Sequence, residues 1–589
     1  MMTKISKLVF VVLFILKCVS IQPVVANKSH PTVFDEDSIN FPNNLTLANG
    51  TNDENKEDAD IVVNIIESSN PESIKVQKPA DAGTHGSQED STDHGGIHLA
   101  SWKWDEFSNL LAFLVMIISA AILKLLFHHC HCLSHLFPES CVLIVIGVVV
   151  GAVVKYGIAE THHHHFPTFT SELFFHFLLP PIILDASYAI YDPEFLSTLA
   201  SILIFAVAGT LFNVFTIGFG LYIVCYIGAM GQFPETMFEK FQEPNVTSLS
   251  DHLTTPFMAT QAPNLTTNAM FNEQFGHTHA TLTAVECLTF SSLISAVDPV
   301  AVLAIFEDIG VNRGLYFLVF GESLLNDGVT VVLYNSMVSL GNLPSATGMD
   351  YLMVFFSFFT VVFGGLMIGI IFGLLTSYIV KFTKETRVIE PLIVLALAYL
   401  SYILAETIHW SGIISLIGCG VVQKRYAFLN ISRKSNTTVK YSIKTLASIS
   451  DCMIFLFLGI VTVSGLNHQW HTGFTLWTCF FCLIFRFSSV YFLSAIINRY
   501  RVKPISLQEQ FIMSYGGLRG AVGFSLAQIL SDDNPFKEMF LTATIFMVFF
   551  TVFIQGGTIK FLVDKLKIKK HEEGVSNKCI LRAKIKFEI

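Results

Sequence analysis

The chain has 589 residues, of which 52% are hydrophobic and only 14% are charged, and its mean hydropathy is +0.57. Soluble domains carry about 25% charged residues, so this composition excludes an ordinary soluble domain and indicates a polytopic membrane protein. Much of the acidic charge behind the formal net charge of −10 lies in one N-terminal block, so the net charge does not indicate binding to nucleic acid.

The first residues are predicted to form a secretory signal peptide. Lys4 and Lys7 precede an apolar core at 8–19, and small residues up to Ala26 suit cleavage. The alternative is an uncleaved membrane anchor. The sequence therefore predicts a leader over residues 1–26.

The segment 27–105 is predicted to be a disordered extracellular or luminal stalk, because it is polar, acidic and poor in aromatic residues. It contains several Asn-X-Ser/Thr patterns, which accept glycan in secreted segments, and two more occur in a predicted outer loop. The asparagines expected to carry glycan are Asn27, Asn44, Asn49, Asn245 and Asn264.

About thirteen apolar segments of membrane-spanning length follow, which predicts an all-α transmembrane domain over 106–558 and a short basic cytosolic tail over 559–589. The predicted spans are 107–127, 139–154, 171–189, 196–228, 282–305, 314–338, 351–380, 389–407, 410–423, 449–464, 474–498, 507–530 and 538–558.

The basic residues predict the orientation of these spans. If the stalk is outside, the Lys and Arg residues gather in inner loops, whereas the outer loops near 340–350 and 465–473 have none. The predicted inner segments that hold the basic residues are the loop after residue 380, the loops 424–448 and 499–506, and the C-terminal tail. The N-terminus is therefore expected outside and the C-terminus inside, and Asn430 and Asn436 are expected to stay free of glycan.

A run of histidines and cysteines at 128–135 follows the first span. Zinc favours such ligands, and cysteines beside a membrane can also be acylated. A loop without a special role is the third interpretation.

Asp298 precedes Pro299 inside an apolar segment. Proline disrupts the preceding helical turn, and transporters use such broken helices to hold ions. The alternative is a simple kink with Asp298 near the inner surface. We expect a broken helix with Asp298 beside an ion path.

Two further carboxylates, Glu322 and Asp327, lie in a span that is otherwise uncharged from 314 to 340. A carboxylate at bilayer depth costs a few kcal/mol, so it usually marks an ion or proton path. Residues four apart share a helix face, which places Asn326 beside Glu322 and Ser323 beside Asp327. Oxygen ligands from Asp327, Asn326, Ser323 and Asp298 would suit an alkali cation. The alternative, a buried acid paired with a basic residue, is favoured for Glu322 only.

Arg486 is flanked by apolar sequence and needs a buried partner, for which we choose Glu322. A second interrupted helix is expected at 515–520, where three glycines surround Arg519. Arg519 could neutralise the carbonyl end of that helix. Close helix packing would explain the glycines but not the arginine. Two breaks in separate halves of a chain match inverted-repeat transporters, whose site lies where the breaks cross.

The chain resembles the animal sodium/proton exchangers of the monovalent cation/proton antiporter superfamily. The motifs that carry the resemblance are 177–186, 295–304, 321–327 and 515–520, within a region of similarity over roughly 105–570. The resemblance implies an NhaA-like antiporter fold of thirteen helices, with a dimerisation part and a mobile core part, that works as a homodimer. It implies a transporter rather than an enzyme, with no cofactor besides the transported Na⁺ and H⁺.

The resemblance also assigns roles to residues. Asp327 would carry cation and proton in turn with Asn326 beside it, Asp298 would line the cation path, and Glu322 would pair with Arg486. One carboxylate predicts electroneutral exchange of one Na⁺ for one H⁺, which would regulate intracellular pH and Na⁺. The expected location is the plasma membrane, with an endosomal pool as a further option, and a calcineurin-B-homologous protein is a family partner. A cation channel or uniporter is the competing function.

Overall fold

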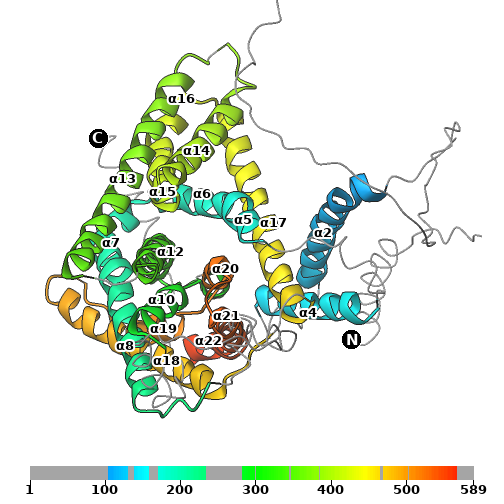
Figure 1. The fold of residues 1–589 in the computed structure, drawn as a ribbon. Coiled ribbons are helices and arrows are strands. Elements are labelled where there is room, and N and C mark those ends of the chain that lie inside the picture. Colours follow the sequence, from blue (N-terminus) through cyan, green and yellow to red (C-terminus); the bar gives the residue numbers. More distant parts are fainter. Residues whose placement is uncertain are drawn as a thin grey trace, which may run out of the picture. The chain divides into compact units, whose positions relative to one another are not determined.

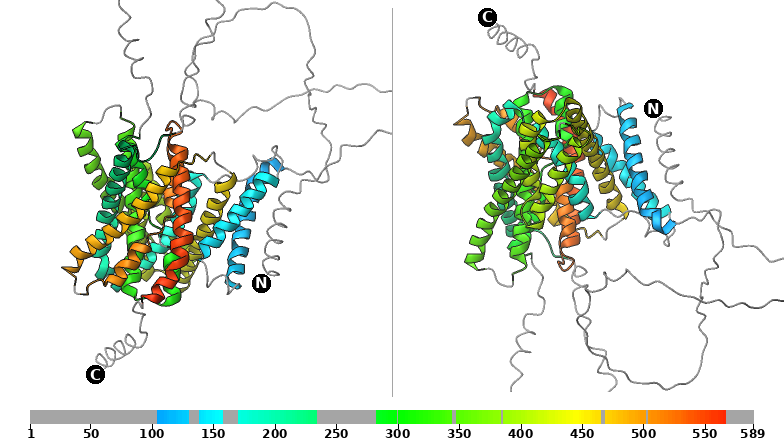
Figure 2. Two further views of the ribbon diagram at one scale, coloured as in Figure 1. Left: turned by 90° about the horizontal axis from the view of Figure 1, so that it is seen from below. Right: turned by 90° about the horizontal axis from the view of Figure 1, so that it is seen from above.

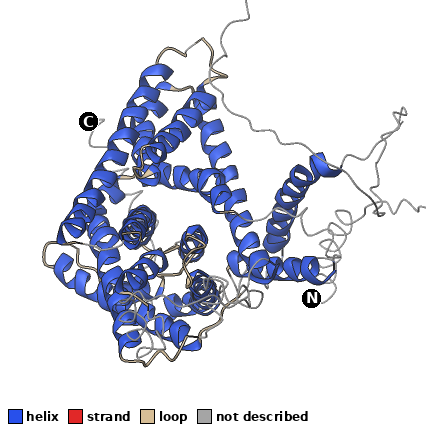
Figure 3. Ribbon diagram, viewed as in Figure 1, coloured by secondary structure: helices blue, strands red, loops and turns tan. Residues whose placement is uncertain are grey.

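The computed structural model describes residues 104–129, 138–157, 170–233, 282–298, 300–343, 347–383, 385–464, 468–501 and 503–566. Within these ranges all regular secondary structure is helical, apart from isolated bridge residues such as Asp298 and Leu518 (Figure 3). The predicted leader, the stalk, the outer loop with Asn245 and Asn264, most of the 128–135 cluster and most of the tail lie outside the described residues.

Figure 1 shows the helices of the described residues, coloured along the chain. In order they are α2 (Trp104–His129), α4 (Glu139–Gly157), α5 (Ser171–Leu173), η2 (Phe174–Leu178), α6 (Leu179–Ile190), α7 (Pro193–Leu203), η3 (Ile204–Gly209), α8 (Thr210–Tyr226), α10 (Ala284–Ile294), α11 (Val300–Ile309), α12 (Arg313–Gly341), α13 (Gly348–Val380), α14 (Glu390–Thr407), α15 (Gly412–Val422), η6 (Gln423–Ala427), α16 (Phe428–Asn430), α17 (Arg433–Ser464), α18 (Thr472–Asn498), α19 (Leu507–Tyr515), α20 (Ala521–Ile529), α21 (Lys537–Phe549), η7 (Phe550–Gly556) and α22 (Gly557–Lys565), where η marks π-helical turns.

Among the described residues, eight helical stretches are long and apolar enough to cross a membrane. In the views of Figure 2 the helices of this region form one bundle and are tilted against one another. Helix α13 exposes large apolar side chains such as Phe355, Phe359 and Phe363, which water would not solvate well. The chain is therefore a multi-pass membrane protein, as its composition predicts.

Each predicted span overlaps a helix or, at 282–305 and 507–530, two helices on either side of a break, but one predicted loop is wrong. The segment 424–448 is predicted to be a loop, whereas α17 begins at Arg433 and extends to Ser464. The first turns of α17 bury a narrow stripe that includes Val439 and Ile443 and expose polar residues around it. Average hydropathy therefore does not reveal this amphipathic half of the helix.

The two predicted interruptions are present, and they cross. One separates α10 from α11, and the other separates α19 from α20. At the crossing, the backbone N–H of Asp298 donates to the carbonyl oxygen of Leu518 at 2.8 Å. A side chain at Gly520 would overlap Asp298, so glycine is required for the two breaks to approach this closely. Figure 1 shows α10 and α20 beside α12, which carries the predicted carboxylates.

Candidate functional site

A cavity of about 600 Å³ lies next to the crossing. Asp298 from the first break and Asp327 from α12 both line it, together with Gly520 from the second break. Both carboxylate residues are half-buried, whereas Asn326 and Gly328 on either side of Asp327 are buried. The cavity is therefore what gives these two acids contact with solvent.

Asp327 is an uncommitted carboxylate. Among the described residues, no hydrogen bond or ion pair engages its side chain. Asp298 differs, because its Oδ1 accepts a hydrogen bond from the backbone N–H of Val300 at 2.9 Å. Asp327 is thus the acid that is freer to bind an incoming proton or cation.

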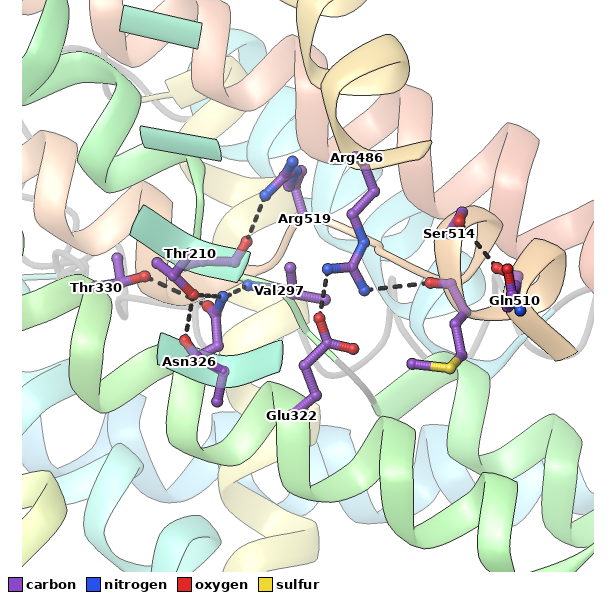
Figure 4. Close-up of polar contacts among 12 residues, drawn as sticks. Thr210, Val297, Glu322, Asn326, Thr330, Arg486, Gln510, Ser514 and Arg519 are labelled. Atoms are coloured by element: carbon purple, nitrogen blue, oxygen red, sulfur yellow. Dashed lines mark hydrogen bonds and ion pairs between the residues drawn. The ribbon is translucent and has the colours of Figure 1, made fainter. Parts of the chain in front are cut away.

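Asn326 joins the first break to the neighbouring helices. Its Oδ1 accepts from the backbone N–H of Val297 at 3.2 Å and from the Thr330 hydroxyl at 3.3 Å. Its Nδ2 donates to the Thr210 hydroxyl of α8 at 2.6 Å, and that hydroxyl donates onward to Ala206 (Figure 4). The unpaired backbone amide that the break creates is therefore satisfied by this side chain.

The predicted buried ion pair is present. Arg486 Nη1 of α18 lies 2.5 Å from Glu322 Oε1 of α12, and both side chains are almost fully buried (Figure 4). Arg486 Nη2 also donates to the carbonyl oxygen of Met513 near the end of α19 at 3.2 Å. A side chain at Gly517 would approach Arg486 Nε to 2.7 Å, so this glycine leaves room for the guanidinium.

Arg519 lies at a helix end other than the predicted one. We expect it at the carbonyl end of its own interrupted helix, but its Nη1 donates to the carbonyl oxygen of Ala296, just after α10, at 3.3 Å (Figure 4). The antiparallel crossing at Asp298 and Leu518 places the guanidinium opposite the other break. The carbonyl end of α19 is served instead by Arg486.

The predicted site residues thus fall into two groups. Asp298 and Asp327 line the cavity, whereas Ser323 and Asn326 are buried and are not among the described residues that line it.

Sequence reasoning missed other charged residues of the cavity wall. They are Asp185, Glu307, Lys424, Lys440, Lys444 and Asp451. The signal for Asp185 and Asp451 was available, since each is an acid within or at the edge of an apolar span. The lysines come from the segment that is predicted to be a loop.

Transporters of the inverted-repeat class place their ion sites where two discontinuous helices meet, and the crossing at Asp298 and Leu518 places this chain in that class. The family model described as "Sodium/hydrogen exchanger, transmembrane" matches residues 117–238 and 268–565. The chain belongs to the sodium/hydrogen exchanger family.

Several curated relatives are similar over most of this chain. It is 42% identical to the Na(+)/H(+) exchanger beta of Oncorhynchus mykiss over 457 residues, which is 78% of this chain and 53% of the relative. It is 38% identical to Na(+)/H(+) exchanger protein 7 of Caenorhabditis elegans, over 86% of this chain and 60% of the relative. It is 40% identical to sodium/hydrogen exchanger 3 of Oryctolagus cuniculus, over 83% of this chain and 53% of the relative. The chain thus spans only part of the length of these relatives.

The fold is similar to that of a solved antiporter. The structure of the sodium proton antiporter MjNhaP1 from Methanocaldococcus jannaschii at pH 8 matches with a TM-score of 0.54 and 16% identity. The match covers 78% of this chain and 99% of that chain. At this identity the likeness shows the NhaA-like fold class of the described helices.

Proposed function

We propose that the protein exchanges Na⁺ for H⁺ across a membrane, with Asp327 as the group that binds them in turn. The observation that carries this proposal is the uncommitted carboxylate of Asp327, which faces a cavity beside two crossed helix breaks. Membership of the sodium/hydrogen exchanger family supports the same function. Competition for one carboxylate explains the exchange, because a carboxylate that holds a proton cannot also hold a cation.

The charge of the site explains the stoichiometry. Asp327 is neutral when protonated and is neutralised again when Na⁺ binds. Moving the empty, charged carboxylate through a low-dielectric environment would cost several kcal/mol, so the loaded forms cross more readily. One carrier carboxylate therefore gives exchange of one Na⁺ for one H⁺ without net charge movement.

The neighbours of Asp327 have supporting roles in this proposal. Asp298 lines the cation path, with one oxygen held by Val300 and its other oxygen available to a cation. Asn326 was expected as a cation ligand, but its carbonyl oxygen already accepts two hydrogen bonds, so we infer that it positions the helix break. Ser323 is buried outside the cavity wall and would contribute only if the helices rearrange.

The orientation and setting follow from the basic residues and from the family. The N-terminus is outside and the C-terminus inside, so the cavity opens to the cytosol, because Lys440 and Lys444 at its edge belong to the inner segment 424–448. We propose a plasma-membrane homodimer, with an endosomal pool as a further location. A calcineurin-B-homologous protein is the proposed cytosolic partner.

The test is pH recovery in acid-loaded cells that lack other exchangers. External Na⁺ is expected to restore cytosolic pH when the chain is expressed, and whole-cell recording is expected to show no added steady current. Cells expressing Asp327→Asn serve as the control. A sizeable Na⁺-dependent current during recovery would favour the channel alternative and contradict electroneutral exchange.

The proposed orientation makes a separate prediction at Asn430. This asparagine lies in an acceptor pattern, but the segment is inside, so mass spectrometry of the purified protein should find it unmodified. Its Nδ2, the atom that a glycan would occupy, donates to the carbonyl oxygen of Ser377 at 3.1 Å. Glycan at Asn430 would contradict the orientation, and glycan at Asn245 or Asn264 would support it.

A further inference from the structure

The segment 424–446 forms a basic surface that the exchange mechanism does not use. It contains six Lys and Arg residues and no Asp or Glu. Lys440 and Lys444 are one turn apart on α17 and are solvent-exposed, and Lys424 of η6 is half-buried. All three line the cavity that contains Asp327, so they lie where it opens.

The three lysines line the same cavity, and none of them forms an ion pair with an acid of the described residues. The Nζ atoms of Lys424 and Lys440 lie 5.0 Å and 6.0 Å from the centroid of the same Phe428 ring. In the described part of the chain, no carboxylate lies within 4 Å of any of the three ammonium groups. Asp185 shares the cavity wall and interacts electrostatically with Lys444 and Lys424.

This arrangement disfavours the charged form of Lys424. Burial, together with the neighbouring charge of Lys440, lowers the pKa of Lys424 to about 8. An anion placed between the two ammonium groups would offset their repulsion. Lysine is a point charge that commonly binds phosphate oxygens, whereas planar carboxylates are better matched by arginine.

Exposed aromatic and aliphatic side chains on the same segment indicate the kind of anion. Tyr426, Leu429 and Tyr441 are 51%, 78% and 75% exposed on the same segment. A neighbouring groove is lined by Arg433, Lys434 and Tyr441. Basic residues mixed with exposed aromatic and aliphatic side chains at the cytosolic end of a spanning helix suit an anionic lipid, whose headgroup and acyl chains need both.

We propose that Lys424, Lys440 and Lys444 bind the phosphate groups of an anionic lipid of the inner leaflet, with Tyr426, Leu429 and Tyr441 against its acyl chains. The bound headgroup places negative charge where the cavity opens. The effect of this charge on cation access rests on the proposed function. The binding of the lipid does not depend on the proposed function.

The test measures binding to the purified full chain in detergent, and it needs no transport assay. The probe is dioctanoyl phosphatidylinositol bisphosphate, with dioctanoyl phosphatidylcholine as the neutral lipid. Lys440→Gln with Lys444→Gln is expected to weaken binding of the phosphorylated lipid about tenfold, since each basic residue near an anionic headgroup adds to the attraction. Both lysines are exposed, so this variant should fold normally.

The matched control removes the same charge elsewhere on the inner side. Lys381→Gln with Lys503→Gln should change the affinity less than twofold, because neither residue lines the cavity. Equal affinity of the Lys440 and Lys444 variant and the unchanged protein would overturn the proposal. Binding of soluble inositol trisphosphate as tight as that of the lipid would also overturn it, in favour of a soluble phosphate site.

Discussion

Asp327→Asn is expected to reduce Na⁺-dependent pH recovery to the background of cells without the protein, while the variant still folds and reaches the membrane. Asparagine has nearly the same shape as aspartate but can neither take up a proton near neutral pH nor neutralise a cation. Because Asp327 has no hydrogen-bond or ion-pair partner among the described residues, the substitution breaks no interaction of the fold. The initial rate of recovery and the amount of surface protein are the two measurements.

The control for Asp327→Asn removes a carboxylate that should not matter. Asp532 lies between α20 and α21 and is paired with Lys537 at 2.6 Å on the protein surface. Exposed ion pairs contribute about 0–1 kcal/mol to stability, so Asp532→Asn should retain both expression and exchange. Normal exchange by Asp327→Asn at equal surface density would contradict the assigned carrier.

Arg486→Ala is expected to damage the fold itself. The change leaves Glu322 buried without a counter-charge and removes the donor that serves the Met513 carbonyl oxygen. Breaking one side of a buried ion pair costs about 3–5 kcal/mol, so the purified variant should melt at a clearly lower temperature and express poorly. Thermal unfolding in detergent measures the effect.

Two variants separate this explanation from a general effect of losing an arginine. Glu322→Gln combined with Arg486→Ala removes the stranded charge, so the double variant should recover part of the lost stability. Arg433→Ala changes an exposed arginine at the start of α17 and should shift stability by less than about 0.5 kcal/mol. A melting temperature of Arg486→Ala equal to that of the unchanged protein would contradict the pairing argument.

The features that follow from membrane physics could be predicted from the sequence. The pairing of Glu322 with Arg486 is an example, because lipid leaves a buried arginine few alternatives to a nearby acid. The crossing of the two breaks is another, since Pro299 and the glycines at 516–520 interrupt two apolar spans in separate halves of the chain. Both features depend on residue types and their spacing alone.

The details of the site depend on packing between distant parts of the chain. The bond between Asn326 and Thr210 joins residues 116 positions apart, and no local pattern indicates it. The target of Arg519 was predicted wrongly because the choice between two helix ends depends on how the breaks cross. The start of α17 was missed because its first turns bury only one face.

The central claim is that Na⁺ and H⁺ occupy the single carboxylate of Asp327 in turn. The most direct measurement titrates purified protein with Na⁺ in weakly buffered solution and follows proton release with a pH indicator. Na⁺ binding at a protonated carboxylate should release protons, and the number released per Na⁺ bound should rise towards about one as the pH is lowered. Asp327→Asn should release none. Na⁺ binding without proton release at a pH where Asp327 is protonated, or unchanged release from Asp327→Asn, would contradict the account.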